Sequence, residues 1–160
     1  MSRPWDDVIS AEEIERYQAA GFGRPTGMGK RPALLIIDVQ YRTVGLERRP
    51  YWEAIEEFKT SCGEVGWSAI DHIVPLLKVF RERGYPVFYP YVAPKMGYDA
   101  GRLAQKVPDI MKIAARGYDF PTEIAPLEGD VLVPKKHPSA FFGTPLASYL
   151  IDKGVDTLVV

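Results

Sequence analysis

The sequence predicts an α/β protein with a doubly wound, mostly parallel sheet flanked by helices, in the three-layer α/β/α arrangement of Rossmann-like folds. Three observations support this class. Short apolar runs that suit buried strands alternate with segments in which apolar residues recur at helical spacing. Gly and Pro concentrate in the breaks between them. The length of 160 residues suits a single domain.

Four apolar runs are expected to form the strands. Residues 33–37 lie between Pro32 and Asp38, and an uninterrupted apolar run of this length is typical of a parallel strand buried on both faces. The other predicted strands cover residues 86–91, 130–133 and 156–160. Pro134 is expected to end the third strand, because proline lacks the N–H that a ladder needs.

Helical periodicity is clearest over residues 68–83, and Gly84 follows as a C-terminal stop. Residues 11–20 predict a short helix, with Ser10 as its N-cap and Glu13 in the position of a capping box. Further helices are expected at 51–60, at 101–106, near 109–116, and between the N-cap Thr144 and Gly154. Residues 39–50 are polar and predict a loop.

Two regions are expected along the chain, namely an N-terminal helix with an extended arm at residues 1–30 and an α/β domain at residues 31–160. The glycines of residues 21–32 do not indicate a dinucleotide-binding loop, since such a loop follows a strand and this stretch precedes one. The domain is expected to be incomplete at its C-terminus, because the sequence stops inside a strand that has no covering helix after it.

Composition argues against several classes of protein. A net charge of −1 without clustered Lys and Arg argues against partners such as nucleic acid or an anionic membrane. No apolar run approaches the roughly 20 residues that span a bilayer, and the acidic N-terminus lacks a secretory signal, so a cytoplasmic location is expected. The single cysteine, Cys62, excludes a disulfide framework and is expected to be an ordinary, partly buried thiol.

Three charged residues are predicted to converge at one edge of the sheet. Asp38 follows the first strand, and Lys135 and Lys136 follow the third. The carboxyl ends of parallel strands form the usual ligand crevice of such folds. Two alternatives stay open, because a strand-end aspartate can cap a loop or bind a metal, and either lysine can be a solvated surface charge. Gln40 excludes a phosphatase-type Asp-x-Asp pair.

The segments ALLIIDVQ and VLVPKKHPSAFFGTPLASYLIDKGVDTLVV resemble the isochorismatase-like cysteine hydrolases, especially the N-carbamoylsarcosine amidohydrolase branch. The resemblance implies that Asp38 is the catalytic acid and that Lys135, four residues before Ser139, is the catalytic lysine, with Lys136 the weaker candidate. It also implies a T-G-x-x-T-x-x-C-V turn after GVDTLVV that carries the nucleophilic cysteine. That position falls a few residues past Val160, so the cysteine is expected on a further segment or a companion chain.

The implied function is hydrolysis of linear C–N bonds in small amides, such as N-carbamoyl amino acids or maleamate-like monoamides. A cysteine would form a thioester, with Asp38 as the base and Lys135 as the cation that favours the thiolate. The resemblance also implies a homo-oligomer. The main alternative is a non-catalytic, truncated homologue that acts as a binding or assembly subunit, and a weaker one is a flavodoxin-like binder of small ligands.

No cofactor and no metal are expected. The Asp-x-His pair of nicotinamidase-like members is absent after the first strand, and the chain contains only two histidines. His72 is expected on the surface of the long helix, and His137 on a surface loop near the crevice.

Overall fold

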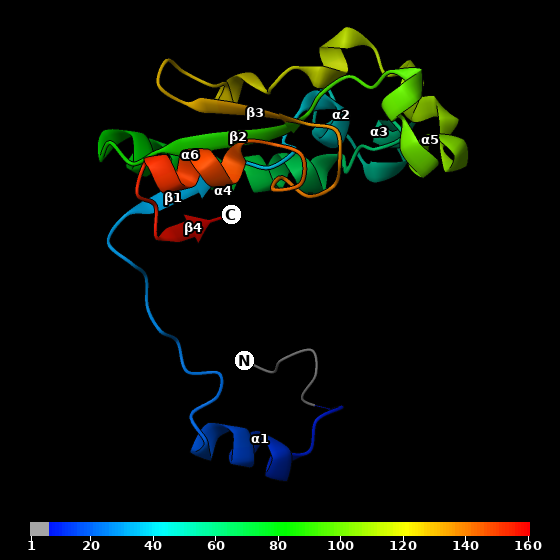
Figure 1. Ribbon diagram of the computed structural model, residues 1–160. Helices are drawn as coiled ribbons and strands as arrows, with labels where there is room; N and C mark the ends of the chain where they lie inside the picture. The colour runs from blue at the N-terminus through cyan, green and yellow to red at the C-terminus, as the bar shows by residue number, and fades with distance from the viewer. Residues whose placement is uncertain (1–6) are drawn as a thin grey trace.

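A four-stranded parallel sheet forms the centre of the computed structural model, which describes residues 7–160 (Figure 1). The strands are β1 (Pro32–Leu35), β2 (Val87–Val92), β3 (Val131–Lys135) and β4 (Thr157–Val159). Their order is β3-β2-β1-β4, and all three neighbouring pairs are parallel. The predicted parallel α/β class is therefore confirmed, and each of the four strands overlaps the segment predicted for it.

Helices flank this sheet. The long helix is α4 (Glu64–Glu82), and the others are α1 (Ala11–Ala19), α2 (Tyr41–Val44), α3 (Tyr51–Glu57), α5 (Gly101–Lys106) and α6 (Leu146–Asp152). Four 3-10 turns complete the described chain, namely η1 (Gly97–Asp99), η2 (Pro108–Lys112), η3 (Ala115–Tyr118) and η4 (Thr122–Ile124). None of the helices described combines the length and the apolarity that crossing a membrane requires.

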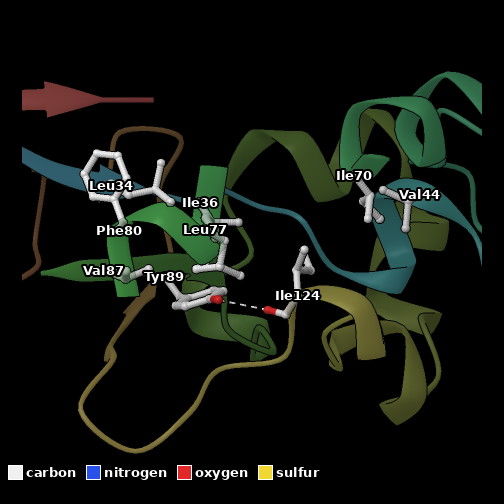
Figure 2. Packing of buried hydrophobic residues seen from close by; sticks show 9 residues of the cluster. All are labelled: Leu34, Ile36, Val44, Ile70, Leu77, Phe80, Val87, Tyr89 and Ile124. Carbon is white, nitrogen blue, oxygen red and sulfur yellow. Dashed lines mark hydrogen bonds between the residues drawn. The ribbon is translucent and has the colours of Figure 1, made fainter. Parts of the chain in front are cut away.

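Alternation along β1 explains why both faces of the sheet are covered. Successive side chains of a strand point to opposite faces. Leu34 packs into a cluster with Leu77 and Phe80 of α4, which Figure 2 shows. Leu35 belongs to a second cluster with Leu146 of α6. The sheet thus lies between α4 and α6, which is the three-layer arrangement that the sequence predicts.

The N-terminal arm holds α1 away from the sheet (Figure 1). None of the α1 residues is buried. Ser10 caps the helix as predicted, with its Oγ accepting a hydrogen bond from the Glu13 N–H at 3.2 Å. Residues 1–6 of the predicted arm lie outside the described residues.

The arm joins the domain beside the start of β4. The backbone N–H groups of Lys30 and Arg31 donate to the Asp156 carboxylate at 2.9 and 3.0 Å. The N–H of Gly29 donates to Thr157 Oγ1 at 2.7 Å. The hydrogen bonds from Arg31 and Lys30 hold the pKa of Asp156 below its usual range.

Pro134 does not end β3, so this prediction was wrong. The strand continues to Lys135, and Pro134 lies opposite Tyr91 of β2. β3 forms one edge of the described sheet, and an edge strand tolerates proline because N–H groups that face away from the sheet have no ladder partner. The consequence is important for the site, since the strand carries Lys135 to the end of the sheet.

Local patterns also missed several short elements. Residues 39–50, predicted as a loop, contain α2, and the predicted helix near 109–116 is replaced by the 3-10 turns η2 and η3. α4 begins at Glu64, earlier than the apolar periodicity indicates. The pattern missed the first turn because apolar side chains there do not face the core; Val65, for example, is 69% exposed. Such short turns depend on tertiary contacts rather than on apolar spacing.

Replacing Tyr89 by phenylalanine should lower the free energy of unfolding by about 1–3 kcal/mol, the usual cost of a buried polar group left without its partner. The buried Tyr89 hydroxyl donates to the Ile124 carbonyl at 2.9 Å (Figure 2) and accepts from Arg81 at 3.1 Å. Urea denaturation measures the change. Tyr91→Phe is the matched control, because both rings pack edge-on against Phe120. Equal effects of the two changes would contradict the assignment.

The Asp156→Asn variant should be less stable than wild type at neutral pH, and the difference should vanish in acid. Because the folded state lowers the pKa of Asp156, its contribution to stability is complete above the unfolded pKa of about 3.9. That contribution is lost as pH falls through the lower, folded pKa. Thermal unfolding between pH 3 and pH 7 tests this, with Asp152→Asn at the exposed end of α6 as control. A difference that does not change with pH would rule the carboxylate out as the cause.

Candidate active site

Asp38 stands at the carboxyl end of β1 in an unusual backbone conformation. Its N–H donates to the Pro90 carbonyl at 2.9 Å, so the β1–β2 ladder continues past the end of β1. Its φ of 59° is the one positive value at a non-glycine residue among residues 7–160. This conformation costs roughly 1–3 kcal/mol, and backbone strain of this kind concentrates at functional sites.

Lys135, the last residue of β3, meets Asp38 at the end of the sheet. β2 separates the two strands, which places β1 and β3 about 10 Å apart, so a long side chain is needed to bridge them. Lys135 Nζ lies 2.8 Å from Asp38 Oδ2, and the lysine side chain is only 2% exposed. The ammonium also donates to the carbonyls of His137 and Pro138 at 3.3 and 3.2 Å. All three of its protons therefore have an acceptor.

Lys136 lies in a different environment from Lys135. Its Nζ pairs with Asp99 of η1 at 2.9 Å and donates to the Pro94 carbonyl. The hydrogen bond from Lys136 holds the pKa of Asp99 below its usual range. Lys136 thus braces the loop that carries η1, whereas Lys135 contacts Asp38.

One oxygen of the Asp38 carboxylate is left without a partner. Oδ2 accepts from Lys135, but Oδ1 is buried and has no hydrogen bond within the described part of the chain. A buried polar atom without a partner is costly, and it usually has a functional explanation. Asp38 therefore retains an acceptor that can take a proton from a reacting group.

A cavity of about 240 Å³ opens beside this ion pair. Its wall combines the apolar side chains Val92, Leu103 and Ile110 with the charged side chains Asp38, Arg42, Lys95, Lys135 and Lys136. Larger hollows lie along α1 and near the amino ends of the strands, where Arg81 pairs with Asp130, but neither lies at the carboxyl ends of the strands. Ligands of doubly wound sheets bind at the carboxyl ends of strands, which favours the smaller cavity.

Gln40 fixes the segment that follows Asp38, and the sequence did not single it out for this role. Its side chain is fully buried. Nε2 donates to the carbonyls of Val92 and Tyr118 at 3.2 and 2.7 Å, and Oε1 accepts from the Val92 N–H at 2.9 Å. One amide thus joins the end of β2, the start of α2 and the end of η3. The available signal was a polar residue directly after an apolar strand.

The two histidines and the cysteine lie outside the ion pair. His72 is exposed on α4, as predicted. His137 is exposed at the cavity rim, and its ring stacks edge-on against Phe142 at 4.9 Å. Cys62 is exposed, not partly buried as predicted, because in the loop before α4 it is the neighbouring Ser61 whose side chain points inward. Among residues 7–160, no three His, Cys, Asp or Glu side chains group as metal ligands would.

Comparison with known proteins identifies the family. The sequence profile of the isochorismatase domain matches residues 32–160. The chain belongs to the isochorismatase family. It is 33% identical to maleamate amidohydrolase of Pseudomonas putida, over 96% of this chain and 68% of that protein. It is 28% identical to N-carbamoylsarcosine amidase of an Arthrobacter species, over 90% of this chain and 53% of that protein.

The fold agrees with this assignment. A cysteine hydrolase from Pseudomonas syringae pv. phaseolicola superposes with a TM-score of 0.68 at 22% identity, over 86% of this chain and 63% of that one. This likeness shows the shared isochorismatase-like fold. The chain thus spans between about half and two thirds of the length of these three proteins. The family inferred from the two sequence motifs is confirmed.

Replacing Gln40 by leucine should destabilise the fold by at least about 3 kcal/mol, because three partly buried backbone groups lose their partner, each at a cost of roughly 1–3 kcal/mol. Chemical denaturation measures the loss. Gln105→Leu on the exposed side of α5 is the matched control and should change stability by less than about 0.5 kcal/mol. A Gln40→Leu protein as stable as wild type would show that the amide does not hold this segment.

Proposed function

We propose that the full-length protein hydrolyses the amide C–N bond of small carboxylated amides, with Asp38 and Lys135 acting on a cysteine thiol. The observation that carries this proposal is the ion pair between the buried Lys135 and the partly exposed Asp38, with the unpartnered Asp38 Oδ1, beside a cavity of small-molecule size. The names of two relatives support the substrate class, since maleamate and N-carbamoylsarcosine are both small amides that carry a carboxylate.

The register of β4 supports a nucleophile carried by a further segment past Val160 or by a companion chain that reaches the same position. β4 pairs in parallel with β1, and Val159 lies opposite Leu34. Asp38 follows Leu34 by four residues, so a residue a few positions past Val160 would arrive at the same edge of the sheet. The family resemblance puts the nucleophilic cysteine there. Cys62 does not line the cavity and is not proposed as a substitute.

In the proposed reaction, Asp38 Oδ1 accepts the thiol proton and the thiolate attacks the amide carbonyl carbon. When the tetrahedral intermediate collapses, the C–N bond breaks and Asp38 returns the proton to the departing nitrogen. Water then attacks the thioester while Asp38 again accepts a proton; the C–S bond breaks, Asp38 returns the proton to the departing cysteine sulfur, and the acid is released, a carboxylic acid from maleamate or a carbamic acid from an N-carbamoyl compound. Lys135 stays protonated throughout, orients Asp38 and stabilises the thiolate electrostatically.

Wild-type full-length protein should release ammonia from maleamate or N-carbamoylsarcosine, and Asp38→Asn should lower kcat/KM by about 10²–10⁴, the usual contribution of a general base. A coupled ammonia assay measures both. The matched control is Asp71→Asn, which removes a carboxylate from the exposed Arg48 pair on α4 and should retain wild-type activity.

Asp38→Asn leaves the buried Lys135 charge without its carboxylate, which can cost several kcal/mol. A second variant, Asp38→Asn with Lys135→Met, removes both charges and is expected to fold but not to turn over. A well-folded wild type that releases no ammonia from either amide would contradict the proposal. It would favour the alternative of a non-catalytic binding or assembly subunit.

A further inference from the structure

Arg42 is a buried cation that the proposed reaction leaves without a role. It lies on α2, is 8% exposed and lines the cavity together with Asp38. Its guanidinium carbon stands 5.2 Å from the centre of the Tyr118 ring. None of the ion pairs formed within residues 7–160 includes Arg42.

The charges around the cavity do not balance. Four of the lining side chains are cations and one is an anion, with the cations being Arg42, Lys95, Lys135 and Lys136. Lys135 pairs with Asp38, and Lys136 pairs with Asp99. Within the described chain, neither Arg42 nor Lys95 forms an ion pair, and the single carboxylate of the cavity, Asp38, acts on Arg42 only at longer range. A buried cation is expensive unless an anion accompanies it, so the site is built for an anionic ligand.

Of these two cations, Arg42 is the better placed to hold a carboxylate. A guanidinium presents a planar pair of donors that matches the two carboxylate oxygens, whereas an ammonium acts as a point charge. Lys95 is only half-buried, and its Nζ already donates to the Lys136 carbonyl at 2.8 Å. Burial lowers the pKa of Arg42 because the guanidinium loses water, yet arginine stays protonated at neutral pH.

The surroundings of Arg42 hold its position. The Tyr118 ring packs against the guanidinium, and the Tyr118 carbonyl accepts from Gln40 at 2.7 Å. Gln40 also immediately precedes α2, so one network fixes both partners of the stack. A donor fork that is held in place before binding loses little conformational entropy when the ligand arrives.

We infer that Arg42 binds the carboxylate of the substrate and thereby selects carboxylated amides over neutral ones. This inference rests on the proposed amidohydrolase function. Asp38 and Arg42 both belong to the segment that follows β1, so the scissile amide and the carboxylate would occupy one small cavity of about 240 Å³. The expected substrates are short, with only a few carbons between the two groups.

Arg116 provides a control that distinguishes carboxylate binding by Arg42 from a purely structural role. Its guanidinium carbon lies 5.8 Å from the centre of the Tyr41 ring, so it forms a second arginine–tyrosine stack between η3 and α2. Arg116 is exposed and does not line the cavity. If Arg42 only attached α2 to η3, the loss of either arginine would have similar consequences.

The test compares two substrates, maleamate and its methyl ester, which share the amide and differ in the negative charge. In the full-length protein, wild type should prefer maleamate, and Arg42→Met should lower kcat/KM for maleamate by about 10²-fold, mainly through KM. The same variant should change kcat/KM for the ester less than about threefold. Arg42→Lys keeps the charge but lacks the planar pair of donors, so its kcat/KM for maleamate should fall about tenfold. Arg116→Met should leave kcat/KM unchanged for both substrates.

Three results would overturn the role of Arg42 while leaving the proposed function intact. These are an equal loss on both substrates in Arg42→Met, a wild type without preference for maleamate, and an Arg116→Met variant that matches Arg42→Met. If wild type releases no ammonia at all, the proposed function fails, and calorimetric titration with maleate then tests Arg42 by itself. Maleate should bind wild type at least tenfold more tightly than Arg42→Met, and equal binding overturns the inference.

Discussion

The ion pair between Lys135 and Asp38 is the interaction on which the site depends. The Lys135 side chain is only 2% exposed, and its ammonium is stabilised there by donating three hydrogen bonds, one to the Asp38 carboxylate and two to backbone carbonyls. Such a pair is a poor source of stability, since desolvating the two charges offsets much of their attraction. The fold nevertheless directs two strands to this one contact, with Asp38 held at a strained φ of 59°. An arrangement that contributes so little to stability is best explained by the chemistry it permits.

Local sequence patterns were sufficient to predict the sheet and the meeting of Asp38 with Lys135. Each of these residues ends an apolar run, and in a parallel sheet all such ends lie at one edge. Strand position alone did not separate Lys135 from Lys136, and the family resemblance favoured Lys135; the pleat of β3 supplies the physical reason, because neighbouring residues on a strand point in opposite directions. The pairing of Lys135 with Val92 across the ladder is not visible in the sequence. Pro134 misled the prediction for a related reason, since its cost depends on whether the strand lies at an edge.

The remainder of the site depends on contacts between distant parts of the chain. The Gln40 side chain bonds to Val92, 52 residues away, and to Tyr118, 78 residues away. Tyr118 carries no local signal, because η3 is a short 3-10 turn without apolar periodicity. Arg42 is uninformative in the sequence for the same reason. An arginine after a strand is normally a solvated surface residue, and only the packing of η3 against α2 buries this one.

The few residues after β1 break three rules that the rest of the domain largely obeys. Asp38 has a left-handed backbone, its Oδ1 has no hydrogen-bond partner, and Arg42 is a buried charge that forms no ion pair among the described residues. Each departure costs free energy. A chain that tolerates local conflict only where a function requires it will show this concentration. The three departures are also complementary, because a free carboxylate oxygen and an unpaired guanidinium are what one small molecule with an amide and a carboxylate would need.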